Sequence, residues 1–314
     1  IGTMCPSYRA TKEERFSTRG RSRLFWEMLQ GEVIKDGWES QELKDALDTC
    51  LSCKGCKSDC PAHVDMASYK AEFLSHYHEK NARPRQALTM GRIGDWAPLA
   101  SNISWLMNGV TQTPVLSNIA KWIGGVAQER GLPKFASKSF RKQFKQAKQA
   151  RLKKVILWVD TFCEHFHPEV ANAAVEVLAH AGFEATLPKT PLCCGRPLYD
   201  FGYLDLAKQK LEKILDAIGD EINSDPNSPI AVVGLEPGCM SVFKDELLKF
   251  FPHDPRAQLL ASNAYLLGDF LHEKGYTPPP LDCNILVHSH CHQKSLFGTK
   301  GDVALLSALG ANAN

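Results

Sequence analysis

The stretch that decides the fold of the N-terminal region is LDTCLSCKGCKSDCPAHV, residues 47–64. It places Cys50, Cys53, Cys56 and Cys60 within eleven positions, with a proline after the last, which is the C-x2-C-x2-C-x3-C-P spacing of iron–sulfur ligands. In chains that bind two clusters, the first three thiolates of such a run hold one cluster and the fourth holds the other. The run therefore predicts a 4Fe–4S site that needs one more cysteine from elsewhere in the chain.

A Cys-Pro pair at position 5 supplies the expected fourth ligand. It looks like the end of an earlier cysteine run, so the same exchange predicts that Cys5 completes the cluster of Cys50, Cys53 and Cys56. Cys60 then serves a second cluster whose other ligands would precede residue 1, which leaves that ligand set incomplete. Structural zinc is the alternative, but zinc sites usually use two separated cysteine pairs, and a third closely spaced cysteine fits iron better.

The bulk composition is that of a globular protein with no general affinity for nucleic acid. The chain has 314 residues, which suggests two domains or more, and its net charge is +2. Eleven cysteines with metal-ligand spacing indicate a reducing compartment. The polar start carries no signal peptide, and no run of eighteen apolar residues is long enough to span a bilayer. We expect a cytoplasmic location, and a first residue other than Met indicates a fragment.

Composition divides the chain into three zones with boundaries near residues 80 and 153. Residues 1–80 hold the cysteine run between three expected helices, at 22–31, 38–50 and 66–80. Helices on both sides of a cluster loop predict a helical ferredoxin-like module. Residues 81–153 show no clear alternation and are expected to form short helices in a basic connector.

The connector ends in a strongly basic stretch, PKFASKSFRKQFKQAKQARLKK at 133–154, which contains no acidic residue. We expect a solvated helix that joins two domains. The alternative is a contact for an acidic partner or an anionic membrane surface, which would place the protein peripherally on the inner face of the membrane. Phe140 and Phe144 are spaced as in a docked amphipathic helix, although core packing explains them equally well.

Residues 154–314 alternate strand and helix patterns, which predicts an α/β domain with a mostly parallel sheet covered on both faces. The overall fold class is thus α followed by α/β. The expected strands are 154–162, 184–188, 229–237 and 284–290, and the expected helices are 167–182, 203–219, 240–251 and 302–310.

A second group of cysteines follows the strands of this domain. Cys163 comes after the first strand, the doublet Cys193-Cys194 after the second and Cys239 after the third. Ligands in parallel sheets gather at the carboxyl ends of the strands, so four soft ligands converge there and predict an iron or zinc site. The alternative is that they are buried free thiols, which is the interpretation we prefer for Cys283.

Cys291 follows the last expected strand as Cys163 follows the first. If it begins a second copy of the unit, the matching doublet would fall near residue 321, beyond the last residue. Both ends of the chain therefore look cut through a metal-binding motif. His288, His290 and His292 lie around it, but their spacing also fits surface or supporting groups, and we assign no ligand role to them.

These motifs together resemble the iron–sulfur half of FAD-linked D-2-hydroxyacid dehydrogenases, such as the D-lactate and D-2-hydroxyglutarate enzymes. They also resemble the iron–sulfur subunits of glycolate oxidase and anaerobic glycerol-3-phosphate dehydrogenase and the "CCG" subunit of heterodisulfide reductase. The resemblance covers nearly the whole chain. It is carried by residues 4–29, 47–74, 192–202, 235–248 and 287–295.

The resemblance implies an electron relay. A flavin (FAD) domain or subunit would oxidise a 2-hydroxy acid, and electrons would pass through two 4Fe–4S clusters and a cysteine-rich CCG domain toward a quinone or a cytochrome. Carried over by position, Cys5, Cys50, Cys53 and Cys56 hold one cluster and Cys60 the other, Cys163, Cys193, Cys194 and Cys239 form a first CCG site, and Cys291 opens a second.

Two departures from the family pattern limit this interpretation. The sequence LEPGC offers Glu236 and Cys239 where the CCG pattern often has two cysteines, so the first site has no spare ligand. The second CCG unit lacks its doublet. No glycine-rich dinucleotide fingerprint is present, so we expect no catalytic residue and no substrate turnover by this chain alone.

Three functions follow from these observations. The leading one is an electron-transfer module of a flavin-dependent D-2-hydroxyacid dehydrogenase, in which the protein fixes cluster spacing and tunes potential. The second is a thiol–disulfide catalyst like heterodisulfide reductase, acting at the CCG site. The third is a zinc-stabilised scaffold that binds a partner through its basic stretch.

Overall fold

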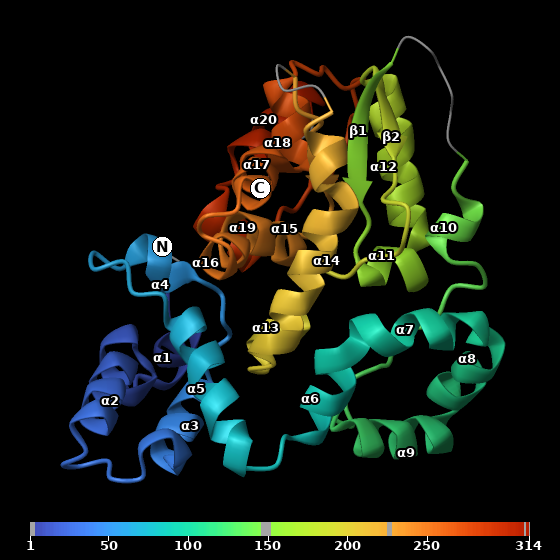
Figure 1. Cartoon of the computed structure of the whole chain (residues 1–314). Coiled ribbons are helices and arrows are strands. Elements are labelled where there is room, and N and C mark those ends of the chain that lie inside the picture. The colour runs from blue at the N-terminus through green and yellow to red at the C-terminus, as the bar shows by residue number, and fades with distance from the viewer. Residues whose placement is uncertain (1–3, 146–151, 225–227, 311, 314) are drawn as a thin grey trace. The chain divides into compact units, whose positions relative to one another are not determined.

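The structure, a computed structural model, describes residues 4–145, 152–224, 228–310 and 312–313 (Figure 1). These residues form two compact units, which are described separately. Unit 1 contains the chain up to Arg83 together with Pro197–Leu206 and His288–Thr299, and unit 2 contains Pro84–Arg196, Ala207–Val287 and Lys300–Asn314. Each unit thus combines stretches that are distant in the sequence, and the boundaries near residues 80 and 153 stay a prediction.

Unit 1 is built from helices that begin at polar caps. Ser17 and Ser40 accept hydrogen bonds from the amides of Gly20 and Leu43, and Asp65 accepts one from the Ser68 amide, as N-cap side chains do. The helices are α1 (Pro6–Thr11), α2 (Thr18–Gln30), α3 (Gln41–Asp48), α4 (Gly55–Asp59), α5 (Met66–Lys80) and α19 (Cys291–Leu296), with short 3-10 turns at Glu14–Phe16 and Gly37–Glu39.

The core of unit 1 lies between α2, α3 and α5. Leu43, Leu47 and Phe73 are fully buried in it, and Phe25 packs edge-on against Phe73 with ring centroids 6.1 Å apart. The helices predicted over 22–31, 38–50 and 66–80 are confirmed as α2, α3 and α5. The glycine predicted to stop the first of them, Gly31, adopts the left-handed conformation of a helix C-terminus (φ 71°).

Two later segments complete unit 1. The first contains most of α13 (Arg196–Asp200) and bonds to the N-terminal helices, because Arg83 donates to the carbonyls of Phe201 and Gly202. Gly202 has φ 70°, and a Cβ there would lie 2.6 Å from the amide nitrogen of Ser75, so this position requires glycine. The second segment is α19, which packs on α4.

Unit 2 contains a four-stranded sheet in the order β2-β1-β3-β4, and all its pairs are parallel. The strands are β1 (Lys153–Trp158), β2 (Phe183–Thr186), β3 (Val232–Gly234) and β4 (Ala264–Leu266). Val155–Trp158 is a continuous apolar run that is buried on both sides, as expected for a strand inside a parallel sheet. The predicted α/β class is confirmed. We did not predict β4, whose three residues directly continue a helix.

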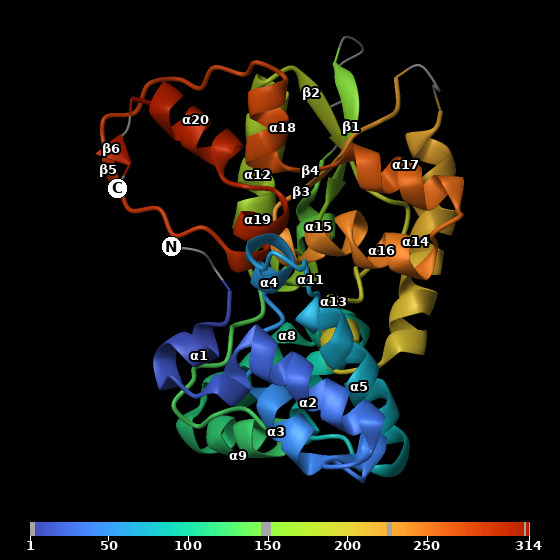
Figure 2. The ribbon, with the colours of Figure 1, turned by 90° about the vertical axis from the view of Figure 1, so that its left-hand side faces the viewer.

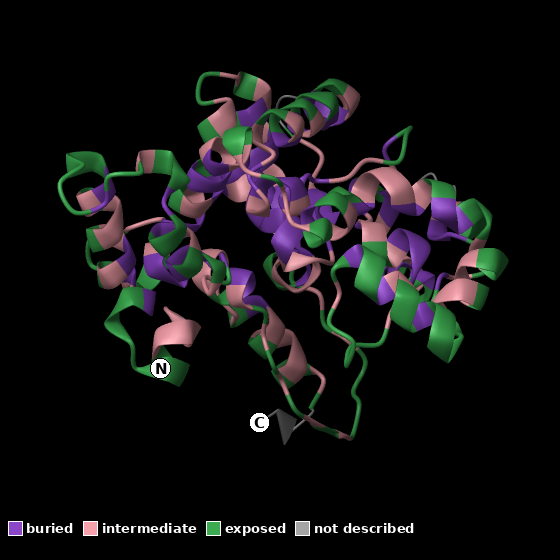
Figure 3. Cartoon of the chain, turned by 90° about the horizontal axis from the view of Figure 1, so that it is seen from below, coloured by how far each residue is buried: buried purple, intermediate pink, exposed green. Residues whose placement is uncertain are grey.

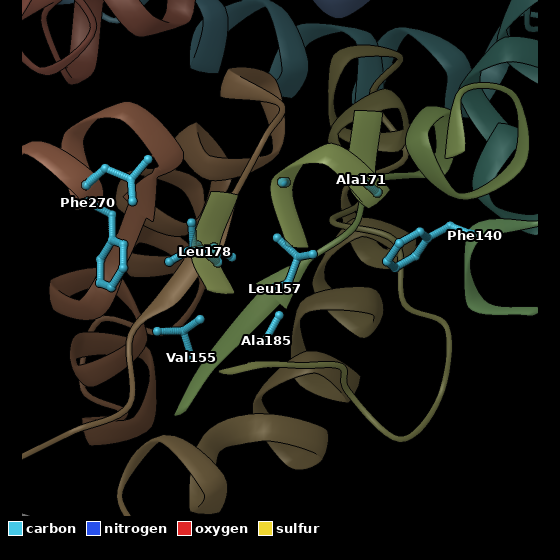
Figure 4. Close-up of a cluster of buried hydrophobic side chains, with 10 residues drawn as sticks. Phe140, Val155, Leu157, Ala171, Leu178, Ala185 and Phe270 are labelled. Carbon is cyan, nitrogen blue, oxygen red and sulfur yellow. The ribbon is translucent and has the colours of Figure 1, made fainter. Parts of the chain in front are cut away.

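Helices cover both faces of this sheet (Figure 2). On one face, Val155 and Leu157 pack with Leu178 of α12 (Pro168–His180) and Phe270 of α18 (Leu267–Glu273) (Figure 4). On the other face, the Trp158 ring packs edge-on against the Phe243 ring of α15 (Pro237–Lys244), with ring centroids 4.8 Å apart. Strand alternation sends neighbouring side chains to opposite faces, so each face of β1 has its own helical cover.

The remaining helices of unit 2 largely follow the sequence pattern. The helices predicted over 167–182, 203–219 and 302–310 are confirmed as α12, α14 and α20, whereas the one over 240–251 is divided into α15 and α16. The elements not yet given are α6 (Arg85–Thr89), a 3-10 turn at Met90–Arg92, α7 (Ile93–Asn102), α8 (Ser104–Gln112), α9 (Pro114–Gly124), α10 (Phe140–Gln143), α11 (Thr161–His165), α14 (Leu204–Ile222), α16 (Glu246–Phe250), α17 (Pro255–Asn263) and α20 (Lys300–Ala308).

The helix predicted over the basic stretch 133–154 is wrong for most of the described residues. Only α10 is helical there, and residues 146–151 lie outside the described part of the chain. The amides before α10 bond elsewhere, since Phe135 donates to the side chain of Asn108 and Ala136 to the carbonyl of His165. Phe140 is buried with Phe144 against it, so their spacing reflects core packing.

The last predicted strand, 284–290, is also mostly wrong. It pairs only over β5 (Asn284–Ile285), with β6 (Asn312–Ala313), in a separate two-stranded sheet. Leu286 is almost fully exposed, so the alternation read in the sequence does not bury one face. Figure 3 shows how buried and exposed residues are distributed over the ribbon. Within the described residues, no helix has the length and apolar composition needed to cross a membrane.

Candidate metal centres

The loop that carries the first cysteines has an unusual backbone. Ser52 and Lys54 adopt left-handed conformations (φ 51° and 58°), and so does Cys5 (φ 50°). Such conformations cost about 1–3 kcal/mol each for residues with a Cβ, so neighbouring structure must hold them. The carbonyls of Ser52 and Cys53 are held from outside the loop, by side chains of α19. A loop held this way keeps its thiols in fixed positions.

Four cysteines line one pocket of unit 1. They are the four that the sequence assigned to the first cluster, and Cys5 reaches the pocket although 45 positions separate it from Cys50. Cys53 and Cys56 are buried and the other two are half-buried. Four thiols around one partly enclosed pocket are a donor set that fits a 4Fe–4S cluster. The structure therefore brings the expected residues together, while their role as ligands stays a prediction.

The pocket opposes ionisation of its own thiols. Burial raises the pKa of Cys56 to about 11, against a smaller opposing effect of the Met66 amide, which donates to the Cys56 sulfur over 3.4 Å. Burial likewise raises the pKa of Cys53, and a backbone hydrogen bond from Gly55 partly offsets it. Iron binds thiolate, so loading must expel the protons that burial retains. The two amides then donate to the sulfurs of the bound form.

Three basic side chains surround the cluster loop. Lys54 is buried and lies 3.4 Å from Asp65, and Lys70 donates to the carbonyl of Cys50 over 2.7 Å. Arg21 is also buried and donates to the carbonyl of Ala46. Four thiolates give a cluster a net negative charge, which nearby cations stabilise, most of all in the reduced state.

The Lys54–Asp65 pair continues into the segment around α13. Asp65 accepts hydrogen bonds from Ser68, whose hydroxyl also receives one from the hydroxyl of Tyr199. The Tyr199 ring centroid lies 5.9 Å from the Lys54 ammonium group. Sequence analysis did not single out Lys54 or Asp65. The available signal was position, because a residue between Cys53 and Cys56 must lie at the cluster.

Cys60 is placed apart from this pocket. Among the described residues that line the four-cysteine pocket it does not appear, and it lies instead with Cys5 and Val64 on a second, more open one. Its amide donates to the carbonyl of Cys56 and so caps α4. This position agrees with the expectation that Cys60 does not serve the first cluster, and its assignment to a second cluster stays a prediction.

Cys291 belongs to unit 1, at the start of α19. The same helix holds the cluster loop, because His292 donates to the carbonyl of Ser52 over 2.9 Å and Ser295 to that of Cys53 over 3.1 Å. Burial is the main reason why the pKa of Cys53 is raised, and the charges of Cys50 and Cys291 add smaller contributions. His292, to which we assigned no ligand role, is therefore a support of the loop.

The second group of cysteines lies in unit 2 beyond the carboxyl ends of β1, β2 and β3. The sulfurs of Cys194 and Cys239 are 2.9 Å apart and buried, and Cys193 bonds to Cys194 and Thr161. Cys163 lies on α11 beside Asp160 and packs against the hydrophobic core. The structure thus brings three of the four predicted ligands together. No group of three or more His, Cys, Asp or Glu among the described residues is arranged as the ligands of one metal ion.

The cysteine site of unit 2 lies beside a buried carboxylate, Asp160, and most of its thiols have raised pKa values. A hydrogen bond to Cys194 and burial raise the pKa of Cys193 well above its usual range, while burial and then Asp160 raise that of Cys163. Asp160 is itself buried, and its Oδ2 atom has no hydrogen-bond partner within the described residues. Thiols beside an unsatisfied carboxylate oxygen fit a bound cation, because a metal ion reverses the local preference for protonated sulfur.

A pocket of about 500 Å³ opens beside Cys193. His165 and Thr161 of α11 lie on its wall, and Arg141, Lys210 and Lys213 supply positive charge. Its size is in the range of small-molecule sites. Gly94 of α7 lies behind the doublet, and a Cβ there would be 2.5 Å from the Cys193 sulfur. Neither this glycine nor the pocket was predicted, since both arise from packing between distant segments.

A buried ion pair follows the doublet. Arg196 contacts Glu246 of α16, and the side chains are 8% and 0% exposed. The pair ties the chain after Cys194 to the helix that follows the Cys239 helix. It thereby fixes the two cysteines relative to each other.

Comparisons with known proteins agree with this geometry. Residues 3–64 match a family model described as a 4Fe–4S dicluster domain. The chain is 24% identical to a D-2-hydroxyglutarate dehydrogenase of Pseudomonas putida, in an alignment that covers 93% of this chain and 32% of that protein. It is also 24% identical to the Escherichia coli protein of that name, over 72% of this chain and 22% of the relative.

A second kind of relative matches a shorter part. Lactate utilization protein A of Bacillus subtilis is 29% identical over 47% of this chain and 61% of that protein. No solved structure matches the chain significantly. The chain spans about a third of the length of the Pseudomonas relative. The expected resemblance to D-2-hydroxyglutarate dehydrogenases is confirmed, and the dicluster match supports a 4Fe–4S cluster on unit 1.

Proposed function

We propose that the chain is an electron-transfer module of a flavin-dependent D-2-hydroxyacid dehydrogenase, because residues 3–64 match a 4Fe–4S dicluster model and the chain is similar to D-2-hydroxyglutarate dehydrogenases. Electrons from a flavin (FAD) domain or subunit enter the 4Fe–4S cluster and leave toward a quinone or a cytochrome, the acceptor held at or near a membrane. Oxidation of the hydroxy acid takes place at the flavin, outside the residues of this chain.

One observation carries the proposal: Cys5 meets Cys50, Cys53 and Cys56 at a single pocket. The sequence assigned these residues to one cluster from the spacing of the cysteine run and from the Cys-Pro pair at position 5. Helices α1, α2 and α3 lie between Cys5 and Cys50 in the chain. The exchange of cysteines between two runs is the ligand pattern of two-cluster proteins. Cys60 lines a second pocket, which it shares with Cys5, and is the proposed ligand of the second cluster.

The residues of unit 1 have distinct parts in this function. A bound 4Fe–4S cluster supplies one-electron transfer at a low energetic cost of rearrangement. The four thiolates hold it, the amides of Met66 and Gly55 donate to its sulfur ligands, and Lys54, Arg21 and Lys70 stabilise its negative charge. Burial of Cys53 and Cys56 keeps water from the cluster and prevents leakage of electrons.

In unit 2, the proposed role of Cys193, Cys194 and Cys239 is to hold iron or zinc, with Cys163 as the fourth ligand. Cys163 would have to turn toward the doublet when metal binds. Asp160 stabilises the positive charge of such a centre. The adjoining pocket of about 500 Å³ is the proposed site where a small acceptor takes up electrons.

Anaerobic purification with matched cysteine variants tests the relay. The chain should be brown, contain iron and acid-labile sulfide in equal amounts, and give a 4Fe–4S electron paramagnetic resonance signal when reduced. Cys5→Ser should lose most of that signal, as Cys53→Ser should, and Cys60→Ser should keep it. Cys283→Ser, a thiol outside both groups, is the control.

The opposite pattern would refute the ligand assignment. A Cys5→Ser chain with full signal, or a Cys60→Ser chain without it, means that the cluster is held differently. A colourless protein with stoichiometric zinc supports the partner-binding scaffold instead.

A thiol–disulfide catalyst is a second candidate function, favoured by the 2.9 Å contact between the sulfurs of Cys194 and Cys239. These two thiols would reduce a substrate disulfide to two thiols and themselves become a disulfide. Two protons and two electrons, passed one at a time through a bound 4Fe–4S cluster from an external one-electron donor, would restore them. Disulfide-reducing activity without any flavin partner, absent in Cys239→Ser, would select this function over the relay.

A further inference from the structure

Helix α9 of unit 2 exposes its apolar side chains and buries polar ones, which is the reverse of the usual pattern in a globular protein. Its apolar residues Val115, Trp122 and Ile123 are exposed, at 70%, 64% and 56%, while Ser117 and Lys121 are buried. The exposed positions recur one helical turn apart and form one face. Helices of soluble domains normally bury that face, so α9 presents it to something outside the described residues.

Helix α8 extends the same surface. It is joined to α9 by Thr113 alone and packs against it, and Trp105 and Leu106 at its start are exposed, Trp105 by 77%. Nine large apolar side chains between residues 99 and 123 are exposed, and the other twelve exposed ones among the described residues are scattered along the sequence. We call these nine the apolar face: Leu99, Ile103, Trp105, Leu106, Val115, Leu116, Ile119, Trp122 and Ile123.

The charge around the apolar face is one-sided. Residues 96–120 contain no Asp, Glu, Lys, Arg or His at all. Residues 84–154 as a whole carry thirteen Lys and Arg but only two Asp and Glu. The rest of the chain carries 24 Lys and Arg and 33 Asp and Glu. The apolar face therefore lies in a strongly basic part of an otherwise acidic protein.

Part of the basic stretch is held directly against α8. Asn108 exchanges two hydrogen bonds with the backbone of Phe135, at 2.8 and 2.9 Å, and Gln112 donates to the carbonyl of Leu132. Lys134 and Lys138, which flank Phe135, are exposed. These contacts place exposed positive charge beside an uncharged apolar surface with tryptophan in it.

We propose that the apolar face docks on an anionic lipid bilayer surface, into which α8 and α9 lie with Trp105 and Trp122 at the level of the headgroups. Helices that lie in this interface combine an apolar face with adjoining lysines and arginines, and tryptophan prefers that depth. Basic residues near the surface add attraction to acidic lipids. A protein partner of acidic character would match the lysines but not a surface of nine apolar side chains. Residues 99–123 contain one charged residue, Lys121, which is buried, and the Arg85 guanidinium lies over the Trp122 ring, 4.7 Å from its centroid.

Vesicle binding by the full 314-residue chain tests this inference. The chain should co-sediment with vesicles made of equal parts phosphatidylglycerol and phosphatidylcholine, bind pure phosphatidylcholine less, and release at high salt, because screening weakens the basic contribution. Trp105→Ser should weaken partitioning about tenfold, since it removes a large apolar side chain from the contact. Trp26→Ser is the matched control, an exposed tryptophan on α2 of unit 1.

Two further variants separate the contributions. Lys134→Gln with Lys138→Gln should remove much of the preference for acidic lipid and leave binding to pure phosphatidylcholine unchanged. Trp105→Phe should still bind, but it should lose a component of the tryptophan fluorescence that brominated lipid quenches in the unmodified chain.

Three outcomes would overturn the inference. They are equal sedimentation with and without vesicles, the same loss of binding in Trp26→Ser as in Trp105→Ser, or self-association through the apolar face without lipid binding, in which case a polypeptide covers it. The inference goes beyond the proposed relay and needs no cluster for its test. A chain that keeps its iron signal but ignores vesicles refutes the docking surface alone.

Discussion

The buried pair of Lys54 and Asp65 offers the sharpest test of how unit 1 is held together. The two charges are 3.4 Å apart, with side chains 0% and 12% exposed. At an effective dielectric constant of 20, their attraction is about 5 kcal/mol, which offsets much of the cost of burying them. Asp65→Asn removes the negative charge and keeps an oxygen that caps α5, so it isolates the electrostatic contribution.

We expect Asp65→Asn to lower the free energy of unfolding of unit 1 by about 3–5 kcal/mol, because the Lys54 ammonium stays buried without its carboxylate. Lys54→Met should cost a similar amount, since it leaves the carboxylate buried instead. The double variant should cost far less than the sum, because a buried pair replaced as a whole is often nearly neutral. The expected coupling energy is therefore about 3 kcal/mol or more.

The assay is anaerobic guanidinium denaturation of the reduced, iron-free chain, followed through the helical circular dichroism. A bound cluster would be lost irreversibly on unfolding, and its negative charge would replace the missing carboxylate beside Lys54. Glu39→Gln is the control, because Glu39 pairs with Lys80 at 2.6 Å between well-exposed side chains, where ion pairs contribute little. If Asp65→Asn behaves like this control, or if the two single effects simply add, the electrostatic reasoning is wrong.

Three more outcomes follow from unit 2. Gly94→Ala should lower metal content at the Cys193 doublet and leave the iron of unit 1 intact, because its Cβ would fall 2.5 Å from that sulfur; separate metal analysis checks it. Glu246→Gln should cost about 3–5 kcal/mol in thermal unfolding, since Arg196 loses a buried counter-charge. Asp269→Asn should stabilise unit 2 at neutral pH, and the gain should shrink on acidification. Burial and then Asp302 raise the pKa of Asp269 above 3.8, so its carboxylate costs stability as pH rises through that raised pKa. A gain that grows on acidification would contradict this.

Local patterns were enough to predict most of the described elements and to group the four cysteines that meet at one pocket. The caps at Ser17, Ser40 and Asp65 and the stop at Gly31 lie in the sequence next to the helices they delimit. Cys5 lies at the pocket of Cys50, Cys53 and Cys56, where its Cys-Pro pair and the exchange of ligands between two cysteine runs predicted it. Its role as a ligand stays a prediction.

Features that depend on distant segments were not predictable in this way. The hydrogen bond between the His292 ring and the Ser52 carbonyl joins residues 240 positions apart, and no local sequence pattern predicts it. The basic stretch failed as a helix because Phe135 and Ala136 bond to other elements, which helix propensity ignores. Likewise, the periodicity of α9 predicts a helix but not that its apolar face points outward.

Helix α19 is synthesised long after the cysteine loop that it contacts, and this order affects how a cluster is inserted. During synthesis the loop at Cys50–Cys56 leaves the ribosome about 240 residues before the helix whose His292 and Ser295 clamp its carbonyls. At typical rates of translation this interval lasts roughly 10 to 50 seconds. Throughout it the loop lacks the helix that later fixes the carbonyls of Ser52 and Cys53, so we expect iron and sulfide to reach its thiols most easily before α19 is made.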